Sequence, residues 1–558
     1  MKELDRRTFL KAVGLGGTML YLRPLAYAAE PIKTGVALGQ ISPIDRLLAD
    51  VAPRQFFGDD FERPHKVLWN KDGMTAALAG QVPRPAEHTD LVIIGGGISG
   101  LTSAYLLKGY KPIVLELAPR FGGNSKGQSW RGMDYSIGAA YVVEPEAETD
   151  IGKLFVELGL ADRMKLKEGE DPVSIDGKIY HKFWTGETVP QDSPAREQFS
   201  KLSAYFKKVL DSEESPYPDI PVTDESQRAS INELDKLTFK EHVLKIAEVS
   251  ALHPHIETAI EHYCWSSFGA SASEISAAAG LNFYAAEFGN LNVFPGGNAA
   301  IAERLLEKLA AALPATNLRT NSLVYDVKVS GSGVQIRYFD RKGAIQTIVA
   351  KAVIMAAPKF VVAKILQDIE PERLEAIRKL KYRAFLVANV LMKGAPPESF
   401  YDLYMLGDGK LESGGTAVES ARKGVTDVIL GNFAHPTQDS TVLTLYRSLP
   451  YDGGRAELYP ASSYDTFRTK FEEQIKGTIL PTLKLSAANI HDLRIARWGH
   501  PLPTAAPGLI ADGVVDRLRK PFKERVFFVE QDNWALPAFE TGVTEAFSAV
   551  PQLKKVLG

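Results

Sequence analysis

The stretch DLVIIGGGISGLTSAYLLKGYKPIVLELAPRFGG, residues 90–123, decides the fold of this chain. Leu91 to Ile94 form an apolar, β-branched run of strand length, and residues 99–107 have the composition of a helix. A run of glycines lies between them. Because a glycine-rich turn that joins a strand to a helix is the pattern of a dinucleotide-binding unit, we expect these three elements in that order.

Each glycine of this stretch meets a different structural requirement. Gly95 permits the tight turn, Gly97 lets the backbone approach a pyrophosphate, and Gly100 lets the helix pack closely against the strand. Ile98 and Ser99 open the helix, so their backbone N–H groups would face the phosphates at the positive end of the helix dipole. Glycine-rich turns are common, and the prediction therefore depends on the order of the elements around this one.

A second strand and a second glycine-rich turn follow. Residues 112–115 are apolar and end in Glu116, about 20 residues after the first glycine, where an acid would hydrogen-bond both ribose hydroxyls and disfavour a 2′-phosphate. Arg120, Gly122 and Gly123 then place a cation on a turn that can face the same pyrophosphate. This second turn indicates FAD rather than NAD.

The pattern E-x-x-x-R-x-G-G resembles the flavin-containing amine oxidase superfamily, which includes phytoene desaturases and protoporphyrinogen oxidase. Members usually continue G-G-R-[ST], whereas this chain has Asn124 and then Ser125, so one phosphate-facing cation is missing or is replaced by Lys126. The resemblance implies an α/β fold: a Rossmann-like FAD-binding domain of the GR2 type with a discontinuous α+β substrate domain.

The resemblance extends to two internal segments. The stretch from Trp130 to Val143 matches family sequence that passes beside the isoalloxazine ring. This implies that Gly138, Ala139 and Ala140 lie next to the flavin, and a simple sheet strand is the alternative interpretation. Backbone near Val327 would contact the adenine in the same way as in the family.

The C-terminal segment carries another part of the resemblance. Residues 526–529 read as a buried strand, and Glu530 resembles the family's glutamate in F-A-G-E. Residues 540–542 match its E-S-G motif at the start of the closing helix. Backbone N–H groups around Ala535 and Leu536 would then stabilise negative charge on the reduced flavin ring.

Three side chains are candidates for contact with a substrate. Trp534 lies where amine oxidases place an aromatic wall of the substrate cage, and a plain core tryptophan is the alternative. Trp498 is a lesser candidate for the same wall, and His500 is the one histidine considered for acid–base work. The only cysteine, Cys264, lies far from the family's C-terminal flavin segment, so we expect FAD without a thioether bond and a buried structural thiol.

The composition limits the partners of this protein. A net charge of −3 over 558 residues provides no basic field for nucleic acid. Apart from the N-terminus, no apolar run is long enough to span a bilayer. His253, His255 and His262 lie close in the sequence but lack further ligands at metal-binding spacing, so we expect no metal site.

The first 28 residues predict export. Arg6 and Arg7 resemble a twin-arginine signal, an apolar stretch follows them, and residues 26–28 fit an A-x-A cleavage site. A disordered basic terminus is the alternative. We therefore expect a mature periplasmic protein without a membrane span after signal removal.

The same patterns predict the domain organisation. After the signal peptide comes an extension that wraps the surface and contains one helix near residues 41–51. The predicted boundaries are 1–28 for the signal peptide, 29–87 for the extension, 88–145, 286–375 and 495–558 for the FAD-binding domain, and 146–285 and 376–494 for the substrate domain.

Three functions fit these observations. The first is oxidation of the C–N bond of an amine or amino acid by hydride transfer to flavin N5. The second is desaturation of an apolar substrate, as in phytoene desaturases, and the third is a non-catalytic flavoprotein. The partners would be a small-molecule substrate and an electron acceptor such as oxygen, a quinone or a cytochrome. Amine oxidases of the family carry a lysine beside N5, but the matching position here is Val387 or Ala388, which favours a dehydrogenase.

Overall fold

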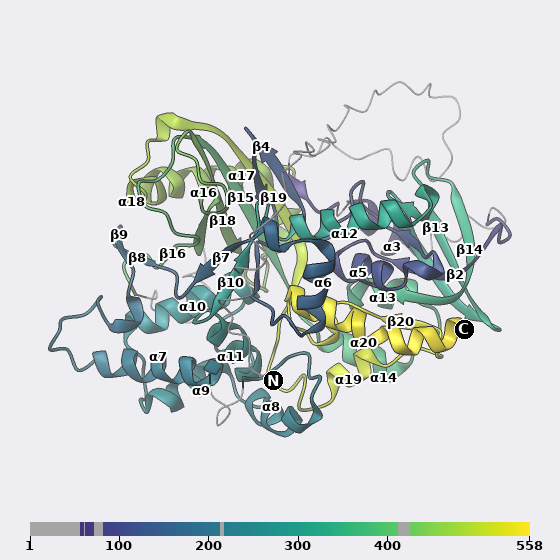
Figure 1. The fold of residues 1–558 in the computed structure, drawn as a ribbon, viewed down its shortest axis with the longest axis horizontal. Coiled ribbons are helices and arrows are strands. Elements are labelled where there is room, and N and C mark those ends of the chain that lie inside the picture. The colour runs from purple at the N-terminus through teal and green to yellow at the C-terminus, as the bar shows by residue number, and fades with distance from the viewer. Residues whose placement is uncertain (1–55, 61, 72–81, 212–216, 411–423) are drawn as a thin grey trace, which may run out of the picture. The chain divides into compact units, whose positions relative to one another are not determined.

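The structure is a computed structural model. The part of the chain that it describes belongs to one compact unit, Ile44–Gly558 (Figure 1). The described residues are 56–60, 62–71, 82–211, 217–410 and 424–558. The predicted signal peptide and the predicted helix near residues 41–51 lie outside these residues.

A seven-stranded sheet is built from three distant parts of the sequence. In spatial order its strands are β11 (Leu318–Arg319), β3 (Ile113–Leu115), β2 (Glu87–Ile94), β14 (Ile345–Met355), β13 (Gly333–Phe339) and β12 (Leu323–Ser330). The strand β20 (Val526–Phe528) also pairs with β14. From β11 to β14 all pairs are parallel, and β20 continues this pattern at the carboxyl end of β14.

The residues of β2 alternate between the two faces of this sheet. Leu91 and Ile93 pack in a core with α5 (Ile98–Leu106), α12 (Ala299–Ala312) and α20 (Phe539–Leu557). Val92 and Ile94 pack in a second core with β12 and β13. A continuous apolar run is needed because both faces are covered, which is why the sequence shows no polar alternation here.

A second sheet has eight strands, and their spatial order differs from their order in the sequence. Its strands are β1 (Phe57–Gly58), β19 (Ile490–Pro503), β15 (Tyr382–Lys393), β18 (Ser440–Ser448), β17 (Asp427–Leu430), β16 (Tyr404–Met405), β8 (Val173–Ile175) and β9 (Lys178–Tyr180). The long strand β19 runs across the predicted boundary at residue 495 and pairs along β15. The domain boundaries themselves stay a prediction.

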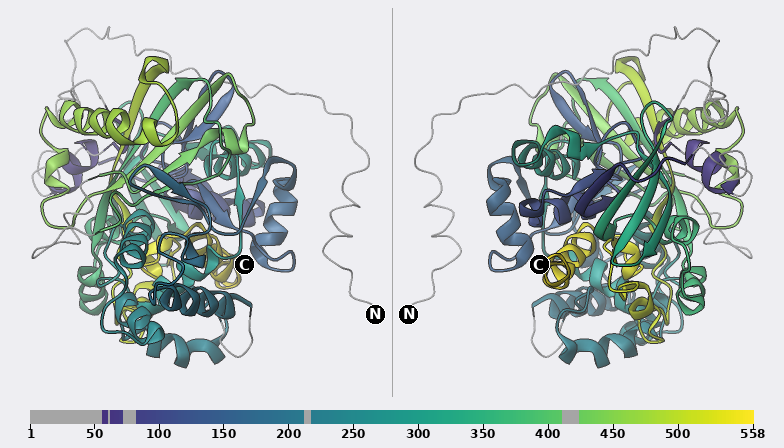
Figure 2. Two further views of the ribbon diagram at one scale, coloured as in Figure 1. Left: turned by 90° about the vertical axis from the view of Figure 1, so that its left-hand side faces the viewer. Right: turned by 90° about the vertical axis from the view of Figure 1, so that its right-hand side faces the viewer.

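Helices cover two ends of this second sheet. Helices α17 (Ser463–Gln474) and α18 (Leu480–Thr482) lie at one end, and a helical group lies at the other (Figures 1 and 2). The helical group comprises α7 (Arg196–Asp211), α8 (Arg228–Asp235), α9 (Phe239–Ala247), α10 (Pro254–Phe268) and α11 (Ala277–Ala286). The group has its own apolar core, in which Cys264 is fully buried, as the sequence predicted.

The described part of the N-terminal extension contacts both sheets. Strand β1 pairs in parallel with β19, and the Arg63 guanidinium donates to the carbonyl oxygen of Asn321 at 3.3 Å. In α3 (Glu62–Leu68), Val67 and Leu68 are buried against the seven-stranded sheet. Within the described ranges, no helix has both the length and the apolar character required to cross a membrane.

Candidate cofactor and substrate site

The first glycine turn follows β2 directly. Gly95 has a positive φ of 112°, and a Cβ atom on it would lie 2.1 Å from the carbonyl oxygen of Ala356. A Cβ atom on Gly100 would lie 1.9 Å from the carbonyl oxygen of Gly95. The packing of the turn against the sheet therefore requires both glycines.

Gly97 differs from these two glycines. Its φ of −78° suits any residue, and a Cβ atom there would meet no protein atom closer than Gly123 Cα at 3.5 Å. The fold therefore does not demand a glycine at this position, which leaves an open cradle at the start of α5. An open position of this kind fits the close approach of a pyrophosphate, so the residues present fit a bound dinucleotide.

The second glycine turn lies against the first. The Gly122 N–H donates to the carbonyl oxygen of Gly96 at 2.8 Å, and Gly97 and Gly122 form an isolated β-bridge. Gly122 and Gly123 both have positive φ angles. The structure thus brings together the two glycine turns that the sequence singled out.

Glu116 is held at the carboxyl end of β3. Its carboxylate accepts hydrogen bonds from the backbone N–H groups of Gly96 at 2.7 Å and Ala118 at 2.8 Å. These bonds fix the acid beside the glycine turn, where the dinucleotide pattern needs it. Unlike Glu116, Arg120 does not bind the first glycine turn in this structure. Its guanidinium donates to the carbonyl oxygen of Gly127 at 3.3 Å.

Asn124 lies beside residues 138–140, the backbone predicted to lie next to the flavin, which connects β5 (Met133–Ser136) to the following strand. Its carbonyl oxygen accepts from the Ala139 N–H at 3.1 Å, and a Cβ atom on Gly138 would lie 2.0 Å from the same oxygen. Ala140 is buried and precedes β6 (Tyr141–Val143). Gly138 must stay a glycine for this close backbone contact.

The segment after β20 and the start of α20 lie near Asn124 and the first turn of α5. The side-chain amides of Gln531 and Asn124 both donate to the carbonyl oxygen of Pro501, at 2.6 and 3.3 Å. Helix α20 crosses α5 at its first turn, where a Cβ atom on Gly542 would lie 2.5 Å from Ser99 Oγ. The predicted cofactor residues from both ends of the chain therefore converge at the first turn of α5.

The remaining predicted cofactor residues lie on nearby segments. Glu530 follows β20, and Ala535 and Leu536 form the turn before α20, with a positive φ of 51° at Ala535. Val327 is buried in β12, and its carbonyl oxygen accepts from the Gln367 N–H at 2.9 Å. Their contacts with FAD stay predictions.

The two candidate tryptophans have different surroundings. Trp498 is buried, its indole N–H donates to the carbonyl oxygen of Ile137 at 2.7 Å, and its ring lies 3.5 Å from a Cβ built on Gly138. Trp534 is enclosed, its indole N–H donates to Glu545 at 2.8 Å, and the Arg519 guanidinium lies 4.4 Å from its ring. Trp498 is thus the tryptophan beside Gly138, in the backbone predicted to lie next to the flavin. Which of the two contacts a substrate stays a prediction.

His500 has an environment that gives no support to an acid–base role. Its ring is half-buried and packs against Phe360 with the ring centroids 4.5 Å apart. Desolvation, Arg455 and His65 together lower the pKa of His500 to about 3. The imidazole therefore stays neutral at physiological pH and does not carry the second proton that a general acid of this kind would donate.

A buried group of acids and tyrosines was missed by the sequence analysis. Glu287, on the loop after α11, accepts hydrogen bonds from the hydroxyls of Tyr141 at 3.0 Å and Tyr263 at 3.1 Å. The Lys167 ammonium lies 2.6 Å from the carboxylate of Asp171 and 3.7 Å from that of Glu287. We call this group the acid–tyrosine cluster. Tyr141 directly follows Ala140, so the cluster adjoins the backbone predicted to lie next to the flavin.

Two further acids belong to the acid–tyrosine cluster. Asp402 and Asp427 are buried close to Asp171 and Glu287. Burial raises the pKa of Asp427 to about 7 and that of Asp171 to about 6, although Lys167 partly opposes the rise at Asp171. Burial and the neighbouring Asp427 also raise the pKa of Asp402.

A cavity lies beside the acid–tyrosine cluster. Three carboxylates and six aromatic side chains contribute to its walls, namely Glu170, Asp171, Glu287, Phe183, Trp184, Tyr263, Tyr284, Phe288 and Tyr404. Aromatic faces and carboxylates both attract organic cations. Among the described residues, no group of histidine, cysteine and acidic side chains has the arrangement of a metal site.

The fold and the glycine cradle define an FAD-dependent oxidoreductase class. The family described as flavin containing amine oxidoreductase matches residues 98–456. The chain therefore belongs to the flavin-containing amine oxidoreductases and is an FAD-dependent enzyme.

Several characterised relatives share this family. The chain is 24% identical over 520 residues to oxidoreductase PigB of a Serratia strain, which covers 84% of this chain and 76% of the relative. It is 33% identical over 155 residues to the 15-cis-phytoene desaturase of Solanum lycopersicum, 26% of each chain. It is 27% identical over 290 residues to a flavin-containing amine oxidase of Oncorhynchus mykiss, 49% of this chain and 51% of the relative.

Solved structures agree on the fold. A putrescine oxidase variant aligns with a TM-score of 0.59 at 18% identity and covers 84% of this chain and 99% of its own. A fatty acid isomerase from P. acnes aligns with a TM-score of 0.58 at 15% identity and covers 83% of this chain and 98% of its own. Neighbours with different reactions share this fold, so the fold alone does not define the substrate.

Proposed function

We propose that this enzyme oxidises the C–N bond of a cationic amine or amino acid. The observation that carries the proposal is the acid–tyrosine cluster beside residues 138–140, the backbone predicted to lie next to the flavin. Burial disfavours the ionised forms of the cluster's acids, and Lys167 is the one lysine described as paired with Asp171 and Glu287. A substrate ammonium group would favour the ionised forms of these acids and be bound by them in turn.

The protein would do three things for the reaction. Glu287, with Tyr141 and Tyr263, would orient the substrate nitrogen, and the aromatic walls would exclude water. Bound FAD supplies the hydride acceptor, and oxidation removes a hydride from the α-carbon and a proton from the nitrogen to leave an imine. A nearby carboxylate or water would receive the proton.

The second candidate function is desaturation of an apolar substrate. The aromatic walls of the cavity and the likeness to phytoene desaturases favour it, whereas the buried acids do not. A long hydrocarbon offers no cation beyond Lys167 to balance the acids of the cluster, and leaving buried carboxylates uncompensated destabilises the complex. A non-catalytic flavoprotein gives no reason for a cavity lined by carboxylates and aromatic side chains.

The same proposal includes export and the electron acceptor. Arg6 and Arg7 support a twin-arginine route to the periplasm. Val387 supports an acceptor other than oxygen, such as a quinone or a cytochrome, because no ammonium group would stand beside N5 to stabilise developing superoxide.

The direct test is anaerobic bleaching of the bound flavin by a panel of amines, amino acids, alkenes and lipids. Glu287→Gln should raise KM for the bleaching amine about tenfold or more, as expected when a charged hydrogen-bond partner is removed. Glu257→Gln is the matched control, because Glu257 of α10 forms an ion pair with Lys240 of α9 and does not line the cavity. Bleaching by alkenes or lipids but by no amine would contradict the proposal.

A further inference from the structure

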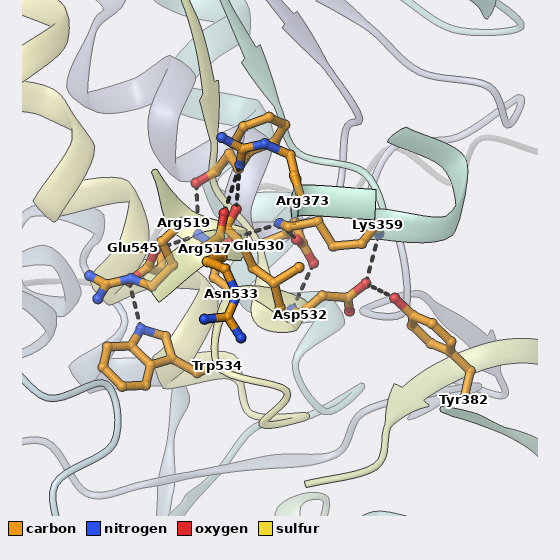
Figure 3. Close-up of polar contacts among 12 residues, drawn as sticks. Lys359, Arg373, Tyr382, Arg517, Arg519, Glu530, Asp532, Asn533, Trp534 and Glu545 are labelled. Atoms are coloured by element: carbon orange, nitrogen blue, oxygen red, sulfur yellow. Dashed lines mark hydrogen bonds and ion pairs between the residues drawn. The ribbon is translucent and has the colours of Figure 1, made fainter. Parts of the chain in front are cut away.

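Lys359 is a fully buried lysine at the carboxyl edge of the seven-stranded sheet. Its ammonium donates to the carboxylate of Glu530 and to the side-chain oxygen of Asn533, and its side chain has no exposed surface (Figure 3). Its backbone N–H also donates to the carboxylate of Asp532 at 2.8 Å. Lys359 thus binds three polar residues of one short segment, namely Glu530, Asp532 and Asn533.

The position of Lys359 is unfavourable for a lysine in two ways. Burying an ammonium group is strongly unfavourable unless it is paired. Lys359 is also the first residue of α13 (Lys359–Ile365), where the helix dipole repels a positive charge. Neither the helix nor the apolar core favours a lysine at this position. We therefore attribute its presence to the residues that its side chain binds.

Glu530 is held from both sides. One carboxylate oxygen faces the Lys359 ammonium, and the other accepts from the Asp532 N–H at 2.7 Å. Burial raises the pKa of Glu530, the Asp532 carboxylate raises it further, and Lys359 opposes both. The net pKa of Glu530 stays well above its usual value, and Lys359 is the charged group that shifts it back toward the ionised form, helped by the Asp532 N–H.

Asp532 is anchored independently of the ammonium group. The Tyr382 hydroxyl, from β15 of the eight-stranded sheet, donates to the Asp532 carboxylate (Figure 3). Asn533 in turn donates to Glu545 of α20 and to the carbonyl oxygen of Phe528, the latter at 2.7 Å. The segment after β20 is thus fixed by contacts with α13, β15 and α20.

Glu530 emerges from the sheet beside the glycine cradle. The Val529 N–H donates to the carbonyl oxygen of Met355 at 3.0 Å, and the Ala356 N–H donates to that of Ile94 at 2.8 Å. The carboxyl ends of β20, β14 and β2 therefore lie next to one another, and Gly95 follows β2. Cofactors of this fold bind at the carboxyl ends of the parallel strands.

From these contacts we propose that Lys359 is a positioning residue for FAD. It favours the ionised form of Glu530 and fixes it at the edge of the cradle, so that the carboxylate can accept a hydrogen bond from a hydroxyl of the cofactor. An ionised acceptor binds a hydroxyl more strongly than a neutral acid does. This role does not depend on which substrate the enzyme oxidises.

The test measures FAD binding to the deflavinated full-length protein by quenching of flavin fluorescence. Lys359→Met should weaken FAD binding about tenfold or more, the loss expected for a charge-assisted hydrogen bond that is disturbed. Its FAD affinity should also depend on pH and recover as rising pH ionises Glu530. Wild type should show this recovery at a lower pH than Lys359→Met, because Lys359 favours the ionised carboxylate. Glu530→Gln should show no such dependence, because it cannot ionise.

Arg373→Met is the matched control for general loss of stability. Arg373 is buried nearby, but its guanidinium donates to the carbonyl oxygens of Arg517, Leu518 and Lys520 rather than to Glu530. It should lower Tm and leave FAD affinity within about twofold of wild type, since it removes no cofactor contact. If Lys359→Met lowers Tm but leaves FAD affinity and its pH profile unchanged, Lys359 is structural only and the proposal is overturned.

A double variant keeps the test decisive if Lys359→Met folds poorly. Lys359→Met with Glu530→Gln removes both charges, so no unpaired carboxylate stays buried and Tm should recover. Its FAD affinity should stay as weak as that of Glu530→Gln. Recovery of both Tm and wild-type FAD affinity in the double variant would contradict the role of the ion pair in cofactor binding.

Discussion

The indole N–H of Trp498 donates to the carbonyl oxygen of Ile137 at 2.7 Å, and both residues are buried. This bond joins β19 of the eight-stranded sheet to the residue before Gly138. The Tyr446 hydroxyl of β18 donates to the Gly138 carbonyl oxygen at 2.6 Å. The second sheet therefore fixes the backbone predicted to lie beside the flavin.

Trp498→Phe should destabilise the protein and alter the flavin environment. The change leaves the Ile137 carbonyl without its donor, which is expected to lower the free energy of unfolding by about 1–3 kcal/mol. Denaturant unfolding measures this loss, and visible circular dichroism of bound FAD reports the change around the ring. Trp534→Phe is the control, because it loses a bond to Glu545 instead. An altered flavin spectrum in Trp534→Phe but not in Trp498→Phe would show that Trp534, not Trp498, lies beside the flavin.

The sequence was informative where local pattern determines structure. The strand, turn and helix around Gly95, Gly97 and Gly100 depend on neighbours within about 30 residues, as a βαβ unit does. The C-terminal strand and the helix after Glu530 could also be placed, because apolar runs and their turns are local signals. The predicted glycines therefore lie together in the structure.

The contacts that were missed connect distant parts of the chain. Lys359 and Glu530 are 171 positions apart, and Tyr141 and Glu287 are 146 apart. No periodicity relates such residues in a single sequence. Lys359 at the start of α13, soon after β14 ends at Met355, was the one available signal, because a cation is unusual at the start of a helix.

Gly97→Leu should abolish FAD loading without unfolding the protein. The φ of Gly97 suits leucine, and its Cβ would make only an ordinary van der Waals contact, 3.5 Å from Gly123 Cα, so the side chain would fill the cradle rather than strain the fold. Absorbance of the purified protein and FAD released on denaturation measure loading, and Tm of the deflavinated protein measures folding. Gly109→Leu is the control, because a Cβ atom there would meet nothing within 4 Å. Normal FAD content in Gly97→Leu would contradict the cradle.

Asp427→Asn should change how stability depends on pH. The pKa of Asp427 is raised from 3.8 to about 7, so the folded state keeps its proton where the unfolded state has lost it. Stability therefore falls as pH rises from about 4 to about 7. The asparagine variant cannot ionise and should flatten this decline, as measured by denaturant unfolding at a series of pH values. An unchanged slope would show that Asp427 does not bind a proton on folding.

Arg6→Lys combined with Arg7→Lys should hold the precursor in the cytoplasm with FAD already bound. The twin-arginine route exports folded proteins, and its signal depends on the arginine pair rather than on positive charge alone. Fractionation of the cells followed by immunoblotting measures the distribution. Export of the double variant at the wild-type level would exclude this route, although it would leave the enzyme's chemistry untouched.

The last prediction concerns oxygen. Val387 is buried in β15 and packs in one apolar cluster with Trp498 and with Ala140, whose backbone is predicted to lie next to the flavin. No ammonium group can arise from this position, so electrostatic stabilisation of developing superoxide should be small. We expect substrate to reduce the flavin readily, oxygen to reoxidise it slowly, and an artificial dye to support faster turnover. Stopped-flow reoxidation of the reduced enzyme, compared with dye-coupled turnover, measures the difference. Reoxidation by oxygen as fast as dye-supported turnover would mean that another group performs the role of the family's lysine.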